Sequence, residues 1–346
     1  MQYREFGTTG LMVSEISFGT MRMTGDAAHV ARDRIPTPAQ IDAQNGRGKR
    51  ALEAALAGGV NCIHSSDDYG TRWMLGEVLE RHSQRAEVHH VIKVTTPDYE
   101  EDGFDSKRIR SNVEAALREL HADRISFVQH LQRGPQVSKN EAYAQAGDQR
   151  RISALADEAS EFRTIIEQLQ TEGKIGSAVT FPHTMPYGRA ALETGNYAGV
   201  AHFLNLIETE LFQLLDDPEW AQSGYFAIRP LLQGMLTDKR VDRTSLDPED
   251  HKTRSGWTSR YKLLDEIRDA VGDPGGSWTS FSLRFALSHP SVTSLVTSAS
   301  SEEQVNVMLE ASDGTYFPAS MLRLVASKVA AAGPMPKSEL FMENLV

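Results

Sequence analysis

The stretch VHHVIKVTTPDYEEDGFDSKRIRSNVEAALRELHADRISFVQH, residues 88–130, sets the fold of this protein. It opens with a β-branched run over 88–94 and closes with another over 125–130. Between these runs, residues 105–120 begin with an acidic cap and carry apolar side chains at helical spacing on one stripe. A strand, a helix and a second strand in this order predict two parallel strands joined by a crossover helix.

The same alternation runs along most of the chain. Strands are predicted at 16–21, 61–64, 88–94, 125–130, 177–181, 199–204, 225–228 and 293–296. Helices are predicted at 49–57, 73–81, 105–120, 162–173, 185–194, 211–221, 259–271, 277–287 and 301–309. These units predict an α/β fold, a (β/α)8 TIM barrel that forms a single domain over residues 1–346, with its active site in the loops after the strands. An open doubly wound sheet is the alternative, and the lack of Gly-x-Gly-x-x-Gly after the first strand disfavours it.

Three of the predicted connections are long: 97–103, 131–153 and 237–257. In a barrel, all three follow strands and therefore lie on the catalytic face. Loops of this length usually shape a pocket or form a lid, although polar surface insertions are the alternative. We therefore expect long loops around the active site.

Composition and charge restrict the partners of this chain. Its 346 residues include 36 Lys and Arg against 47 Asp and Glu, a formal net charge of −11. This acidic balance disfavours nucleic acid and anionic membranes, and every apolar stretch is shorter than the roughly 20 residues that span a bilayer. We find no signal peptide, and the lone Cys62 fits a reducing compartment. We expect a cytoplasmic protein with a small-molecule substrate; its oligomeric state stays open.

The densest polar cluster follows the second predicted strand, where HSSDDYG occupies residues 64–70. An isolated phenol ionises near about pH 10, so a tyrosine needs a nearby cation to serve as a proton donor at neutral pH. Tyr69 is the candidate general acid, and Lys93, at the end of the third predicted strand, is the candidate cation. In the alternative interpretation, Lys93 extends from the strand end into water.

His64, Asp67 or Asp68, and His130 form an alternative set of candidate ligands for a metal. No closely spaced pair of histidines supports such a site, and aspartates after a strand often accept backbone hydrogen bonds in turns. We predict no metal. Cys62 lies within a predicted strand and is interpreted as a small core residue.

Several segments, in order along nearly the whole chain, strongly resemble those of aldo-keto reductases. The matches are YREFGTTGLMVS at 3–14, ISFGTM at 16–21, GVN at 59–61, YG at 69–70, GEVL at 76–79, Lys93, GKI at 173–175, GMLT at 234–237 and SSEEQ at 300–304. The resemblance implies a barrel whose lower end is capped by an N-terminal β-hairpin. It also implies reduction of aldehydes or ketones with NADPH by an Asp, Tyr, Lys and His tetrad.

Tyr69 and Lys93 fall on the tyrosine and lysine of that tetrad, and the other two positions differ. The Phe-Asp-Thr-Ala segment of the family reads IHSS at 63–66, so His64 stands in the place of the aspartate. At strand four, Tyr-Gln-x-His reads VQHL at 128–131, which puts His130 one residue early and Leu131 in the histidine's place. A one-residue offset turns a side chain to the other face of a strand unless a bulge intervenes.

The residues that correspond to the family's cofactor contacts are also altered. The resemblance assigns the carboxamide pair to Thr180 and Phe181, and the glutamine of strand six to Ala201. The segment after which the resemblance places the pyrophosphate loop reads IRPL at 228–231, and it contains Arg229. At the adenosine end, Ser300 replaces a basic residue and Gln304 is retained. This set leaves NADP, NAD or no cofactor open.

Three hypotheses about function follow. In the one that we adopt, the protein is an oxidoreductase that reduces or oxidises a small, sugar-like carbonyl or hydroxyl compound with a nicotinamide cofactor. In the second, it is a cofactor-independent epimerase or lyase that uses His64, Tyr69 and Lys93, because a histidine that titrates near neutral pH suits proton transfer. In the third, the barrel is catalytically silent and serves binding, since a fold alone does not determine function.

Overall fold

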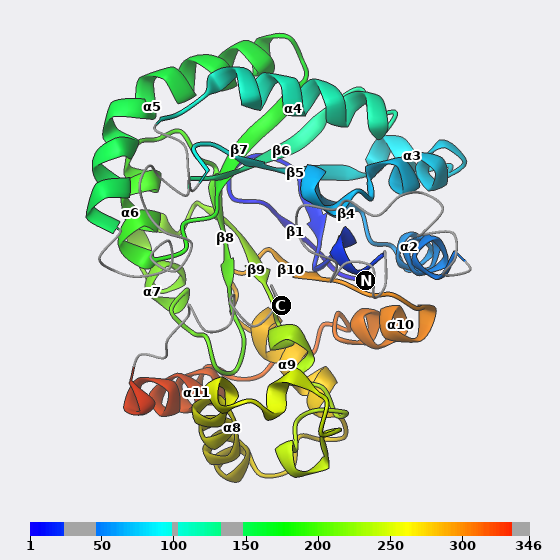
Figure 1. Ribbon diagram of the computed structural model, residues 1–346, viewed down its shortest axis with the longest axis vertical. Coiled ribbons are helices and arrows are strands. Elements are labelled where there is room, and N and C mark those ends of the chain that lie inside the picture. Colours follow the sequence, from blue (N-terminus) through cyan, green and yellow to red (C-terminus); the bar gives the residue numbers. More distant parts are fainter. Residues whose placement is uncertain (24–45, 99–102, 133–147, 334–346) are drawn as a thin grey trace.

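Parallel strands close into a barrel in the computed structural model, which describes residues 1–23, 46–98, 103–132 and 148–333 (Figure 1). Neighbouring strands pair in the order β10-β3-β4-β5-β6-β7-β8-β9. The strands are β3 (Ile16–Gly19), β4 (Cys62–Ser66), β5 (His89–Thr95), β6 (Ile125–Leu131), β7 (Ile175–Thr180), β8 (Gly199–Phe203), β9 (Gly224–Ile228) and β10 (Ser294–Thr297). The predicted (β/α)8 barrel is therefore confirmed.

Helices surround this barrel, as Figure 1 shows. They are α2 (Arg47–Ala57), α3 (Arg72–Glu80), α4 (Ser106–Glu119), α5 (Asp148–Thr171), α6 (Met185–Glu193), α7 (Phe212–Leu215), α8 (Thr258–Val271), α9 (Trp278–Leu287), α10 (Glu302–Glu310) and α11 (Ala319–Ala332). Helix α4 shows how the sequence builds them: the Asp105 carboxylate caps its first turn, and Ile109, Val113 and Ala116 are its buried side chains. Among the described residues, no helix is long and apolar enough to cross a membrane.

The structure differs from the predicted elements in three places. Helix α5 begins at Asp148, within the predicted connection 131–153, of which 133–147 lie outside the described residues. The helix predicted over 211–221 is reduced to α7 and a separate 3-10 turn that starts at Pro218, because proline cannot continue a helix. Helix α11 was not predicted. Of the connection 97–103, residues 99–102 also lie outside the described residues.

The connection predicted over 237–257 consists largely of short 3-10 turns. Asp242 and Asp250 each accept a hydrogen bond from a backbone N–H and so cap two of them. Its third turn has no side-chain cap, so aspartates stabilise two of the three turns of this connection.

The 3-10 turns within the described residues are η1 (Thr20–Arg22), η3 (Asp67–Tyr69), η4 (Arg85–Glu87), η6 (Pro218–Trp220), η7 (Leu232–Gly234), η8 (Arg243–Ser245), η9 (His251–Thr253) and η10 (Ser255–Trp257).

Side chains alternate between the two faces of each barrel strand. One face contributes to a cluster inside the barrel, and the other packs beneath the helices. At the floor of the interior, the Phe6 ring centroid lies 4.5 Å from that of Phe127 and 4.4 Å from that of Phe226. The barrel is thus closed from below by aromatic packing, and its functional groups lie above this floor.

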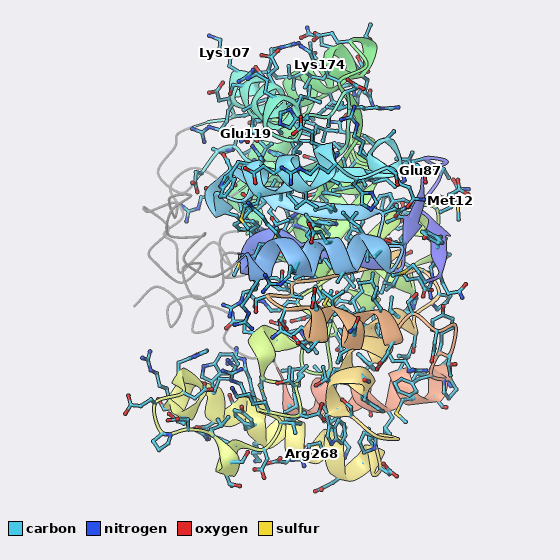
Figure 2. All side chains as sticks on the ribbon, turned by 90° about the vertical axis from the view of Figure 1, so that its right-hand side faces the viewer. Met12, Glu87, Lys107, Glu119, Lys174 and Arg268 are labelled. Atoms are coloured by element: carbon cyan, nitrogen blue, oxygen red, sulfur yellow. The ribbon has the colours of Figure 1, made fainter. Side chains whose placement is uncertain are left out.

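The N-terminal hairpin, β1 (Tyr3–Glu5) and β2 (Met12–Ser14), supplies Phe6 and covers the lower end of the barrel, as predicted. Figure 2 shows Met12 at the same end of the molecule as Glu87, which precedes β5. Arg4 fastens the hairpin: its guanidinium lies 2.6 Å from the buried Glu15 carboxylate and donates to the carbonyl of Val292, 2.5 Å away. The carboxylate also accepts hydrogen bonds from Ser312 and Tyr316.

We expect Arg4→Ala to lower the free energy of unfolding by about 3 kcal/mol, because it leaves the Glu15 carboxylate buried without its cation. Urea unfolding followed by circular dichroism measures this loss. The matched control is Arg268→Ala on α8, whose partner Asp265 is exposed, and we expect it to cost less than about 1 kcal/mol. Equal losses in the two variants would contradict this account of the hairpin.

Candidate active site

Tyr69 and Lys93 meet at the carboxyl end of the barrel. Strand β4 leads directly into η3, which ends at Tyr69, and Gly70 follows in the left-handed conformation with φ of 60°. Lys93 lies near the end of the neighbouring strand β5. Its Nζ donates a hydrogen bond of 2.5 Å to Tyr69 Oη, and it lies 4.9 Å from the centroid of the tyrosine ring. The structure therefore brings the predicted acid and cation into direct contact.

The aspartates before Tyr69 shape the turn. Asp67 Oδ2 accepts a 2.7 Å hydrogen bond from Asn112 Nδ2 of α4, and Asp67 Oδ1 accepts bonds from Ser66 Oγ and the backbone N–H of Asp68. These contacts tie η3 to the helix layer and agree with the turn interpretation. No group of His, Cys, Asp and Glu that could hold a metal occurs within residues 1–23, 46–98, 103–132 and 148–333.

His64 lies inside the barrel, below the Tyr69 and Lys93 pair. Its ring meets that of Phe226 edge to face, with centroids 4.6 Å apart, and its Nε2 is 3.8 Å from Cys62 Sγ. Burial, together with the smaller effect of the Lys93 charge, lowers the His64 pKa from 6.5 to about 3. The imidazole is therefore neutral at physiological pH. The second hypothesis required His64 to titrate near neutrality, and this environment does not favour it.

His130 does not join the pair, which corrects the prediction that it belongs to the site. Strands β5 and β6 stay in register from Val91 opposite Phe127 to Thr95 opposite Leu131, so no bulge turns His130 inward. Its ring instead lies beneath the helices, where Nδ1 is 2.7 Å from Tyr197 Oη and Nε2 is 2.7 Å from the carbonyl of Thr96.

Burial also lowers the pKa of His130, to about 4, so this ring is neutral as well. Leu131 occupies the interior position that the offset assigned to it, among the side chains of the barrel cluster. The one-residue offset of His130 therefore turns its ring to the outer face of the strand, as strand alternation predicts.

Thr180 also faces away from the interior, contrary to the prediction that it contacts a cofactor. It stands opposite His130 in the ladder, and its neighbours Val179 and Phe181 both belong to the interior cluster. Phe181 packs against Phe203, with ring centroids 5.3 Å apart. Aromatic rings therefore occupy the position where the family places polar carboxamide contacts.

Arg229 follows β9 in the left-handed conformation, with φ of 61°. Its guanidinium carbon lies 4.0 Å from the centroid of the Phe203 ring, and its Nη1 is 3.7 Å from Glu208 Oε1. Asn205 Nδ2 donates both to the Arg229 carbonyl, at 3.1 Å, and to Glu208 Oε2, at 2.8 Å. These contacts fix the Arg229 guanidinium at the barrel mouth. The left-handed backbone at this position is a strained conformation of the kind that often occurs at functional sites.

Asn205 and Glu208 were missed in the sequence. A signal was present: Asn205 directly follows the strand predicted over 199–204, and Glu208 lies three residues later in the same loop, where barrel sites are built. Both side chains are buried in the structure.

Ser300 and Gln304 lie together at the N-terminus of α10. The Gln304 side-chain oxygen accepts from the Ser300 backbone N–H at 2.8 Å, and Ser301 caps the helix. The first turn of this helix also carries Glu302 and Glu303, which satisfy the positive end of the helix dipole. Ser300 and Gln304 therefore supply neutral polar groups at this end, whereas the aromatic rings of Phe181 and Phe203 do not reproduce polar carboxamide contacts.

Comparisons with known proteins agree with this architecture. The family model "Aldo/keto reductase family" matches residues 15–329. The chain is 22% identical over 357 residues to "Uncharacterized oxidoreductase YqkF" of Bacillus subtilis (strain 168), covering 99% of this chain and 98% of that protein.

Two solved structures share the fold. The holo form of the aldo-keto reductase AKR11C1 from Bacillus halodurans superposes with a TM-score of 0.69 at 18% identity, covering 95% of this chain and 96% of that one. The glycerol dehydrogenase AKR11B4 from Gluconobacter oxydans gives a TM-score of 0.67 at 20% identity, with 96% of each chain covered.

We expect His130→Asn to flatten the dependence of stability on acid pH. The unfolded ring binds a proton near pH 6.5 and the folded ring only near about 4, so acid favours the unfolded wild-type chain across this interval. Urea unfolding between about pH 7.5 and 4.5 should show a smaller loss of stability in the variant. His82→Asn, at a partly exposed position outside the barrel, is the control. Equal slopes for wild type and His130→Asn would contradict the burial of this ring.

Proposed function

Because this chain belongs to the aldo/keto reductase family, we propose that it is an oxidoreductase that interconverts a small carbonyl compound and its alcohol at Tyr69 and Lys93. The observation that carries this proposal is the 2.5 Å hydrogen bond between Lys93 Nζ and Tyr69 Oη. The pair lies at the end of the barrel where enzymes of this fold place their chemistry. Sugars, polyols and other small hydroxylated compounds are the substrates to test first.

In the reducing direction, Tyr69 Oη donates a proton to the carbonyl oxygen of the substrate. The phenolate that remains is stabilised by the Lys93 ammonium group, which already contacts this oxygen. In the oxidising direction, the phenolate accepts the hydroxyl proton. The His64 imidazole stays neutral throughout and takes no proton, because its pKa of about 3 lies far below the working range.

The proposed cofactor is NADP or NAD, which when bound supplies or accepts the hydride. Ser300 and Gln304 would contact its adenosine end at the N-terminus of α10, and Arg229, at the barrel mouth, is the cation available to its phosphates. A basic residue at position 300 would favour NADP over NAD, because it would pair with the additional phosphate of NADP. Ser300 is uncharged and gives no such preference, so affinity measurements with both cofactors must decide between them.

We expect NADPH or NADH to quench the emission of the protein's 4 tryptophans with micromolar affinity. Arg229→Met should weaken this binding by about tenfold, the loss for a charge-assisted hydrogen bond. Arg163→Met, remote from the barrel mouth on α5, is the control. Absence of quenching at millimolar concentrations of either cofactor would overturn the assignment of these residues.

We expect Tyr69→Phe to lower kcat at least about a hundredfold, the usual scale for a lost general acid, while cofactor binding is retained. Steady-state oxidation of the nicotinamide in the presence of a carbonyl substrate measures the effect. Tyr3→Phe, in the hairpin at the opposite end of the barrel, should retain the wild-type rate. Near-normal turnover of Tyr69→Phe would remove Tyr69 from the mechanism.

A further inference from the structure

The barrel interior holds buried polar groups that the proposed reaction does not use. Gln129 is 0% exposed, and within the described residues neither its amide nitrogen nor its amide oxygen has a hydrogen-bond partner. His64 is 1% exposed, and its Nδ1 has no partner in the same part of the chain. A buried polar group without a partner costs about 1–3 kcal/mol, so such groups in a folded protein call for an explanation.

The strand register places these groups around Lys93. Gln129 of β6 stands opposite Lys93 of β5, so both side chains project from the same, interior face. The Lys93 charge lowers the pKa of the His64 ring, and the neighbouring Gln129 amide raises it. The Gln129 amide is close to the ring but does not meet the geometry of a direct hydrogen bond. Three side chains from three adjacent strands, β4, β5 and β6, therefore converge.

The chemistry of these groups is complementary. A neutral imidazole has one donor and one acceptor nitrogen, and an amide has both donors and an acceptor oxygen. A lysine ammonium has three donors, of which one is used by Tyr69 Oη. The donors in this set therefore have matching acceptors among uncharged groups.

We propose that His64 and Gln129 form a neutral pair of positioning residues that supports Lys93 from within the barrel, so that Lys93 and Tyr69 work without a buried carboxylate. This inference rests on the proposed function of Tyr69 and Lys93. Uncharged acceptors hold an ammonium group without offsetting its charge, whereas a carboxylate at either position would offset it. The full charge then stabilises the phenolate that proton donation leaves.

The titratable groups near the pair are few within the described part of the chain. Cys62 lies beside His64 on β4, and burial raises its pKa to about 12, so it stays a neutral thiol. From β9 across the barrel, the ring of Phe226 faces His64. The carboxylates nearest to Tyr69 in the sequence are Asp67, which Asn112 holds, and Asp68, which is exposed.

Two substitutions that introduce a carboxylate test the role of the pair. In His64→Asp and Gln129→Glu, the negative charge disfavours the phenolate, so the fall of kcat at high pH in the reducing direction should move upward by about one pH unit. His90→Asn is the control, because His90 is buried on β5 but faces the helix layer. If both carboxylate variants turn over with the wild-type pH profile, the pair does not act on Lys93 and Tyr69.

Gln129→Met keeps the side-chain volume and removes the amide. We expect kcat to fall by about tenfold with KM nearly unchanged, because the substrate is still bound while the acid is less well placed. Gln129→Asn, which keeps a shorter amide, should recover part of the rate. A rise in KM with kcat unchanged would instead make Gln129 a substrate contact and overturn the positioning role.

A measurement without turnover separates this inference from the proposed function. In the ¹H–¹⁵N spectrum of the wild-type protein, His64 should show a neutral ring, and Gln129→Met should shift its nitrogen signals while those of His90 stay in place. Unchanged His64 signals would refute the pair itself. Shifted signals in a protein that neither binds a nicotinamide nor turns over a carbonyl compound would retain the pair but reject the proposed function, and with it the positioning role.

Discussion

The alternation of side chains along the barrel strands is the constraint on which the rest of this structure depends. Because the ladder from Val91 opposite Phe127 to Thr95 opposite Leu131 has no bulge, each side chain on these strands is assigned to the interior or to the helix layer. Because of this alternation, Gln129 lies beside Lys93 on the interior face, whereas His130 and Thr180 face the helix layer. Phe6, Phe127 and Phe226 form the aromatic floor beneath these polar groups.

Electrostatics in this interior follow from burial. A histidine in the place of a carboxylate does not supply the missing negative charge, because desolvation and the Lys93 ammonium both oppose a charged ring. The outcome is an acid and cation in contact, supported by neutral groups. At the opposite side of the mouth, Arg229 has a carboxylate close by, since Glu208 lies 3.7 Å from its guanidinium. The two cations of the site therefore have different surroundings.

The cofactor region shows how far a family resemblance extends to individual contacts. The helix terminus at Ser300 and Gln304 depends mainly on backbone N–H groups, which any sequence that forms this helix provides. Carboxamide contacts would depend on particular side chains, and in this chain Phe181 and Phe203 pack against each other at that position. The fold is therefore retained more readily than individual side-chain contacts.

The sequence by itself determined the barrel and the placement of Tyr69 and Lys93 at adjacent strand ends, because hydrophobic periodicity is a local property. The hairpin cap followed from the family resemblance of residues 3–14. The sequence also showed that His130 is offset by one residue, but not which face the ring takes. Only the tertiary structure decided that, since a bulge depends on the pairing with β5. The neutrality of His64 and the contact of Arg229 with Glu208 were likewise beyond the sequence, because desolvation and ion pairing arise when residues far apart in the chain close into one barrel.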